Sequence, residues 1–224
     1  MKRTVILSLG LLTAFSGAYA AEEEEIEPFV WSRATLDLIE SGDAARGEEI
    51  ATKQKCSKCH GDNGIAEDDE SPSIAGQVPA YNFKQLVDYR TEVRESMDMK
   101  KTTRRLGLQD MSDLAAYFAT LPPEPPEGKV EPPLLVTKGD MDRFLLPCQA
   151  CHGKKGEGLG FEVPALAGQK IDHFVEVMTA FQEGDRENDQ YGRMRFVASQ
   201  LTEKEIEQIA AYYAAPPTEE DEEE

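Results

Sequence analysis

The chain is poor in several residue types that support common protein chemistries. Its 224 residues include only four cysteines, three histidines and one tryptophan. After residue 20 it has no apolar run of the roughly 20 residues that a bilayer span needs. Basic residues are also scarce, since 24 Lys and Arg stand against 43 Asp and Glu, a net charge of −19. Nucleic acid is therefore excluded as a partner, because phosphate binding needs a basic surface.

The first 20 residues have the pattern of an export signal. Met1-Lys2-Arg3 is basic, residues 5–18 are largely apolar, and Ala18-Tyr19-Ala20 fits the small-x-small cleavage pattern. We predict a signal peptide over residues 1–20 and an exported protein with no stable membrane span once the leader is cleaved. An uncleaved anchor is the alternative, although the apolar stretch is short for a bilayer.

All four cysteines fall in a pentapeptide that occurs twice, at residues 56–60 and 148–152. In a C-x-x-C-H run the two thiolates add to the vinyl groups of a haem, and the histidine coordinates the iron. A redox dithiol or a four-cysteine zinc cluster is the alternative, but neither requires the histidine after each second cysteine. We therefore predict two covalently attached haem c groups (iron), bound by Cys56, Cys59, Cys148 and Cys151 and ligated by His60 and His152.

The two motifs belong to an internal duplication. They lie 92 residues apart, as do the Pro-x-x-Ala-Gly-Gln segments at 72–77 and 164–169 and the glycines Gly47 and Gly139. The final Ala-Ala-Tyr segments lie 95 apart, so the second copy gains three residues between Gln169 and Ala210. We expect the proline of each segment to position the adjacent motif's histidine through its backbone carbonyl.

Apolar spacing predicts an all-α protein of two tandem helical domains, each wrapped around one haem. Each copy should have a short helix before its motif, a helix at 81–90 or 171–181, and a final helix after Asp110 or Thr202. The expected organisation is a signal peptide (1–20), an acidic N-terminal extension (21–40), domain 1 (41–121), a proline-rich linker (122–136), domain 2 (137–215) and an acidic disordered tail (216–224).

A second axial ligand for each iron is expected among the methionines, whose sulfur raises the reduction potential. A ligand used in both copies should recur at the repeat spacing. Only Met99 and Met194 do so, 95 residues apart and each seven residues before a leucine. We predict that Met99 and Met194 are the second ligands.

The other candidates have simpler explanations. Met111 and Met178 stand where the other copy has Ile or Leu, which indicates core positions. Met97 and Met141 have no methionine counterpart, although Met97 remains a nearby competitor for Met99. His173, whose counterpart is a tyrosine, could make a bis-histidine site, but a polar helix residue is favoured.

Over residues 41–214 the chain resembles the dihaem cytochrome c4 family. The resemblance rests on the segment 42–47, both C-x-x-C-H-G motifs, both Ala-Gly-Gln segments, both methionines ahead of a leucine and the final helices. It implies two tandem cytochrome c-like domains about a pseudo-twofold axis with facing haems. It also implies ligation by His60 with Met99 and by His152 with Met194, and electron carriage in the periplasm. The segment 21–39, which holds Trp31, departs from the family pattern.

Haems with both axial positions filled leave no site for a substrate, which favours an electron carrier and not an enzyme. The expected partners are redox proteins, namely electron donors and a terminal oxidase or a sulfur-oxidising enzyme. A dihaem electron-accepting subunit, of flavocytochrome sulfide dehydrogenase or thiosulfate dehydrogenase type, could use the same ligands and stays open. A dihaem peroxidase or thiosulfate dehydrogenase itself would need a vacant position or a fifth cysteine. Basic residues beside both methionines are candidates for docking: Lys100, Lys101, Arg104, Arg105, Arg193 and Arg195.

Overall fold

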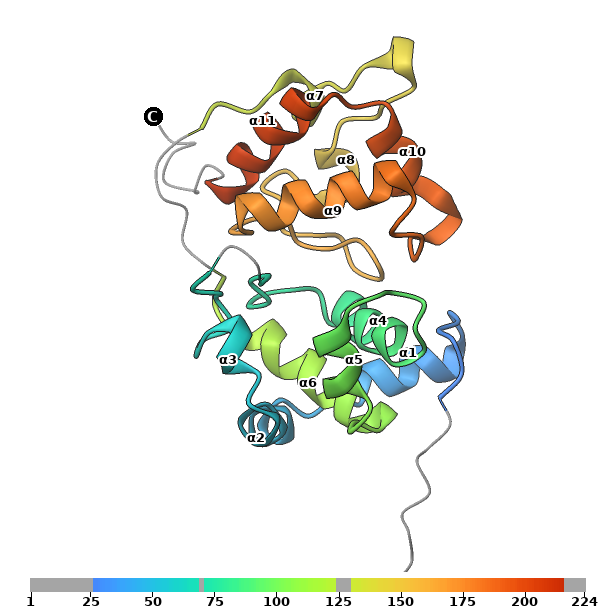
Figure 1. Ribbon diagram of the computed structural model, residues 1–224, viewed down its shortest axis with the longest axis vertical. Coiled ribbons are helices and arrows are strands. Elements are labelled where there is room, and N and C mark those ends of the chain that lie inside the picture. Colours follow the sequence, from blue (N-terminus) through green and yellow to red (C-terminus); the bar gives the residue numbers. More distant parts are fainter. Residues whose placement is uncertain (1–25, 69–70, 124–129, 216–224) are drawn as a thin grey trace, which may run out of the picture.

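The computed structural model describes residues 26–68, 71–123 and 130–215. The expected signal peptide and acidic tail lie outside these residues. Figure 1 shows two helical lobes, one built from each copy of the duplication. The described residues contain no β-strand, only an isolated bridge between Asp140 and Leu145. The prediction of an all-α protein is confirmed, and none of the described helices is long and apolar enough to span a membrane.

The helices follow the duplication. The first lobe contains α1 (Arg33–Glu40), α2 (Ala44–Gln54), α3 (Ser57–His60), α4 (Pro79–Arg90), α5 (Met97–Thr103) and α6 (Leu108–Thr120). The second contains α7 (Leu134–Thr137), the 3₁₀ turn η1 (Met141–Arg143), α8 (Gln149–His152), α9 (Ile171–Glu183), the 3₁₀ turn η2 (Gln190–Gly192), α10 (Arg193–Ser199) and α11 (Glu203–Ala214).

Each lobe has its own apolar core beneath its final helix. Phe83 of α4 packs with Met111 and Phe118 of α6 in the first lobe. Met178 of α9 packs with Ile206 of α11 in the second. Met111 and Met178 are buried, which confirms that they are core residues. Small separate cores of this kind leave a haem as the natural centre of each domain.

The expectation of a helix before each motif is right for the first copy and wrong for the second. Asp43 caps α2 by accepting from the amides two and three residues on, and Asp140 makes the same cap at η1. The first helix then runs to Gln54, whereas η1 ends at Arg143. Only residues 141–147 separate the second cap from its motif, and Pro147 disfavours helix in the residue before it. Gly42 and Gly139 each directly precede the capping aspartate of their copy. The structural counterpart of Gly139 is therefore Gly42 and not Gly47.

An arginine three residues after each capping aspartate ties the start of the domain to its final helix. Arg46 makes two hydrogen bonds to the Asp113 carboxylate, of 2.8 and 2.9 Å. Arg143 makes two to Glu205, of 2.9 and 3.1 Å. Such bidentate pairs fix geometry as well as charge. The side chain of Thr202 caps α11 and Glu205 returns a bond to the Thr202 amide, so the two residues form a capping box.

The three extra residues of the second copy lie in the loop before α10. Residues 91–96 join α4 to α5, whereas residues 184–192, which include η2, join α9 to α10. The longer loop reaches into the first lobe. Asn188 donates to Gln85 at 2.9 Å and to Asp88 at 2.7 Å, and its carbonyl accepts from Lys84 at 2.7 Å. The longer loop thus builds a buried polar contact between the domains.

The segment before domain 1 also contacts both lobes. Helix α1 packs on α4 and α6, and the ring of Phe29 lies edge-on to that of Phe83. Trp31 donates from Nε1 to the Glu162 carboxylate at 2.7 Å, and its ring lies 5.6 Å from that of Phe161, both residues of the second lobe. Residues 26–40 therefore bridge the two domains.

Candidate haem sites

Each C-x-x-C-H motif forms one short helical turn, α3 or α8. The amide of the histidine donates to the carbonyl of the first cysteine, at 3.1 Å for His60 and 2.9 Å for His152. This turn places the two cysteines three residues apart on one face, with the histidine next to the second. The first cysteine of each motif is half-buried and the second is exposed, and none of the four forms a disulfide.

The state of the thiols argues against the two alternative readings of the motif. Burial raises the pKa of the Cys148 thiol to about 11 and also raises the pKa of Cys56. A redox dithiol needs a lowered thiol pKa, because the thiolate is the nucleophile. Within the described ranges, no three side chains of His, Cys, Asp or Glu converge on a possible metal position. The four cysteines are therefore not arranged as a zinc cluster.

Both histidines are held through the backbone of a proline. Nδ1 of His60 lies 2.9 Å from the carbonyl oxygen of Pro72, and Nδ1 of His152 lies 2.9 Å from that of Pro164. A carbonyl can only accept, so Nδ1 carries the hydrogen and Nε2 keeps its lone pair for iron. Burial lowers the pKa of both histidines against the opposing effect of this bond, which favours neutral imidazole. The predicted role of the two prolines is confirmed.

The loop that carries each proline is fixed in the same way in both domains. The carbonyl of Gly64 accepts from the amides of residues 74 and 75, and the carbonyl of Gly156 accepts from those of 166 and 167. Further along, the Gly76 amide donates to the Phe118 carbonyl at 2.9 Å, and the Gly168 amide to that of Tyr213 at 2.9 Å. The final helix of each domain thus positions the loop that holds the proximal histidine.

Met99 and Met194 occupy corresponding short helices. Met99 lies in the first turn of α5, and Met194 lies in the first turn of α10. Both side chains are half-buried. The side chain of Ser96 accepts from the Met99 amide at 3.4 Å, and that of Asp189 accepts from the Met194 amide at 2.9 Å. Both methionines therefore sit at a helix start whose backbone is held by a capping side chain.

The competing residues have different environments. The side chains of Met97 and Met141 are turned to the surface, with 71% and 66% of their area exposed. His173 lies on α9, where burial and the nearby cations Arg94 and Arg186 lower its pKa to about 3. Its Nδ1 atom is buried and has no hydrogen-bond partner in the described part of the chain.

Several buried side-chain donors lack a hydrogen-bond acceptor among the described residues, which a bound group could supply. The side-chain donors Asn82 Nδ2, His173 Nδ1 and Tyr213 Oη are buried without a partner among residues 26–68, 71–123 and 130–215. Leaving such an atom unpaired costs about 1–3 kcal/mol, so a partner is expected. A haem carries two carboxylates that can accept these bonds. His173 interacts electrostatically with His60, and Tyr213 with Cys148, so one such donor lies near each motif, where it fits a bound haem.

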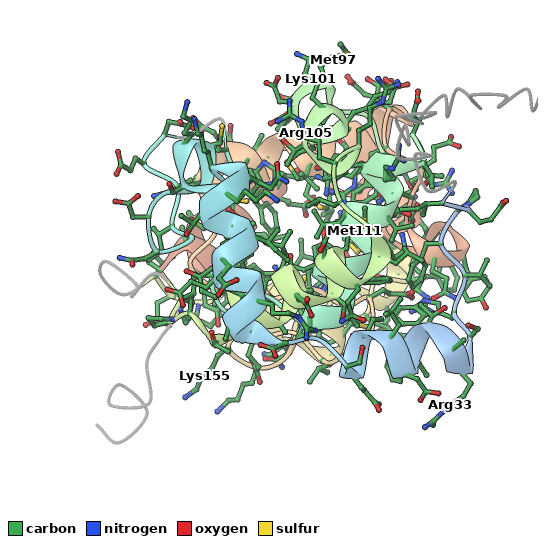
Figure 2. The ribbon with its side chains drawn as sticks, turned by 90° about the horizontal axis from the view of Figure 1, so that it is seen from below. Arg33, Met97, Lys101, Arg105, Met111 and Lys155 are labelled. Carbon is green, nitrogen blue, oxygen red and sulfur yellow. The ribbon has the colours of Figure 1, made fainter. Side chains whose placement is uncertain are left out.

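The candidate docking residues are largely paired within the chain. Lys100 contacts Glu92 at 2.6 Å, and Arg195 contacts Asp189 at 2.8 Å. Lys101 and Arg193 make looser pairs, at 3.5 Å each. Arg104 and Arg105 are exposed and have no ion pair with a described residue. Figure 2 shows Lys101 and Arg105 at one edge of the molecule, together with Met97. Exposed positive charge thus lies at the end of α5.

Two C-x-x-C-H turns in two helical domains, each with its histidine held by a proline carbonyl, define a dihaem c-type cytochrome, an electron-transfer protein with two covalent haem c groups. A family model described as cytochrome c matches residues 44–122, and one described as cytochrome c oxidase, cbb3-type, subunit III matches residues 144–212. The chain belongs to the cytochrome c4 family.

The relatives bear out the resemblance read from the sequence. Cytochrome c4 of Pseudomonas aeruginosa is 33% identical over 182 residues, which are 77% of this chain and 88% of that protein. The crystal structure of reduced recombinant cytochrome c4 from Pseudomonas stutzeri superposes with a TM-score of 0.71 at 31% identity, over 78% of this chain and 99% of that one. A thiosulfate dehydrogenase electron acceptor of Stutzerimonas stutzeri is 29% identical over 198 residues, covering 81% of this chain and 91% of that protein.

Sequence reasoning missed the residues that join the two domains. Arg186 and Asn188 lie in the longer loop of the second copy, and Glu162 receives the bond from Trp31. Gln77 and Gln169 were visible only as landmarks of the repeat, although each makes its principal contacts in the other domain. The one available signal was the identical spacing of the two Ala-Gly-Gln segments.

Proposed function

We propose that this cytochrome carries electrons in the periplasm through two six-coordinate irons, ligated by His60 with Met99 and by His152 with Met194. The observation that carries the proposal is the equivalence of the two sites. In each, the proximal ring presents Nε2 because Nδ1 is held by a proline carbonyl. In each, a half-buried methionine starts the short helix that precedes the final helix.

The chemistry that the haem supplies when bound is reversible one-electron transfer at iron. The protein's part is to hold the ligands and exclude water. Met194 packs against the apolar cluster that contains Met178 and Phe181, and an apolar shell with a thioether ligand favours a high reduction potential. A site closed on both axial sides cannot bind a substrate at iron. Exchange with redox partners through an exposed haem edge is then the natural function.

The ligands are tested by the ferric spectrum of single variants. Met99→Ala and Met194→Ala should each remove about half of the methionine-to-iron charge-transfer band, because each opens one of two irons. Met97→Ala is the matched control, since it removes a neighbouring methionine of the same short helix that is exposed, and it should leave the band unchanged. A band that survives both ligand substitutions would show that the assignment is wrong.

A second candidate is the role of electron acceptor for a thiosulfate-oxidising enzyme. It is favoured by the similarity to the thiosulfate dehydrogenase electron acceptor of Stutzerimonas stutzeri. The discriminating measurement is the rate at which thiosulfate reduces this protein in the presence of a purified thiosulfate dehydrogenase. Reduction no faster than that of an unrelated c-type cytochrome would exclude this role and leave the general carrier, with a terminal oxidase as the expected acceptor.

A further inference from the structure

The glutamine that ends each Ala-Gly-Gln segment binds the other domain. Gln169 accepts from the Ser73 amide at 3.0 Å and donates to the Ser73 carbonyl at 3.0 Å. Gln77 accepts from the Ala165 amide at 2.7 Å and donates to the Ala165 carbonyl at 3.0 Å. Ser73 and Ala165 are themselves 92 residues apart. The two glutamines thus make one reciprocal, pseudo-symmetric contact across the domain interface.

The orientation of both side-chain amides is determined by their surroundings. Besides the cross-domain amide, Oε1 of Gln77 accepts from the Val78 amide at 2.9 Å, and Oε1 of Gln169 accepts from the Lys170 amide at 3.0 Å. A flipped side chain would place its NH₂ group against two N–H donors and its oxygen against a carbonyl. Oε1 therefore faces the amides of Ser73 and Ala165.

Each of these bonds ends on the peptide group that holds a proximal histidine. The Ser73 N–H and the Pro72 carbonyl belong to one peptide unit, and the Pro72 carbonyl accepts from His60 Nδ1 at 2.9 Å. The Ala165 N–H and the Pro164 carbonyl form the corresponding unit for His152. A continuous chain of hydrogen bonds therefore runs from each histidine, through one peptide group, to a glutamine of the opposite domain.

We infer that Gln77 and Gln169 are positioning residues that tune the haem of the opposite domain, Gln169 acting on His60 and Gln77 on His152. Hydrogen bonds in a chain polarise one another. A bond from the Ser73 N–H to Gln169 makes the Pro72 carbonyl a better acceptor, which makes the His60 ring a stronger electron donor to iron. A stronger donor stabilises the ferric state and lowers the potential of that haem. The inference rests on ligation of iron by the two histidines, as proposed above.

The test is the distribution of one electron between the two haems in the half-reduced protein. Haem-methyl NMR signals, assigned by NOEs to each domain's own side chains, report this distribution during a redox titration. Gln169→Leu should raise the potential of the first haem and shift the electron toward it by about twofold or more. Gln77→Leu should shift the electron by a similar factor toward the second haem. Gln169→Glu keeps the acceptor and should not raise the potential of the first haem.

The opposite signs of the two shifts separate tuning from mere loosening of the interface. A loosened interface would expose both haems and change both potentials in either variant. Shifts in the same direction, or no shift, would overturn the inference. Gln169→Asn, which withdraws the amide by one methylene, replaces Gln169→Leu if that variant does not fold. The methionine-to-iron band is recorded for every variant, so that an intact band with no crossed shift refutes this inference and leaves the ligation unchallenged.

Discussion

Two arginine-bound carboxylates, one on each final helix, should make the protein acid-sensitive in a defined range. Asp113, whose side chain is 2% exposed, has its pKa lowered from 3.8 to about 2, chiefly by the hydrogen bonds from Arg46. Glu205, 24% exposed, has its pKa lowered from 4.5 to about 2, chiefly by Arg143. We predict that Asp113→Asn and Glu205→Gln destabilise the protein at neutral pH and much less in acid.

The size of this destabilisation follows from the pKa shifts of the two acids. Each unit of pKa difference between the folded and unfolded states is worth about 1.4 kcal/mol. Asp113 should therefore contribute about 2 kcal/mol. Glu205, the more exposed of the two acids, should contribute about 2–3 kcal/mol, because solvent screening reduces the roughly 3.5 kcal/mol that its larger shift alone would give. Because the pKa of each acid is lower in the folded state than in the unfolded state, its full contribution to stability is present above the pKa of the unfolded state. It should be lost progressively as the pH falls from about 5 to about 2.

Urea unfolding followed by far-ultraviolet circular dichroism at pH 6 and at pH 2.5 measures this contribution. At pH 6 each variant should lose about 2 kcal/mol of unfolding free energy, and at pH 2.5 most of the difference from the unsubstituted protein should vanish. Glu207→Gln, at an exposed acid of the same helix α11, is the control and should change little at either pH. An equal loss at both pH values would refute the reasoning, because the contribution would then not depend on ionisation.

Two further predictions concern the domain interface and the docking surface. Asn188→Ala removes three buried side-chain hydrogen bonds, with Gln85, Asp88 and Arg186, and should lower the unfolding free energy by about 2–4 kcal/mol. Calorimetry should then show the two domains unfolding in separate transitions. A single transition at an unchanged temperature would contradict this prediction. Arg105→Glu should slow electron exchange with an acidic redox partner at low salt. At high salt, its exchange rate should equal that of the unsubstituted protein. Arg33→Glu, at the opposite edge in Figure 2, is the charge-matched control, and equal rates for the two variants would exclude docking near α5.

The sequence by itself determined the chemistry of each half of the molecule. A C-x-x-C-H run is contiguous, so the cysteines and histidine meet within one helical turn whatever surrounds them. The repeat spacing identified Met111 and Met178 as core residues, because equivalent positions in a duplicated fold have equivalent environments, and their burial confirms this. The proline that holds each proximal histidine was predicted in the same way, since it recurs at the same distance from both motifs.

Only the tertiary structure decided how the halves are joined. The sequence predicted two pre-motif helices, but the second segment is too short and ends in a proline, so it forms a single 3₁₀ turn. The repeat spacing showed that the second copy has three more residues, but not that the longer loop carries Asn188 into the first domain. It marked Gln77 and Gln169 as repeated residues without their partners. These contacts join residues about 90 to 130 positions apart, and such pairs form only when two finished domains dock, which no local pattern of side chains encodes.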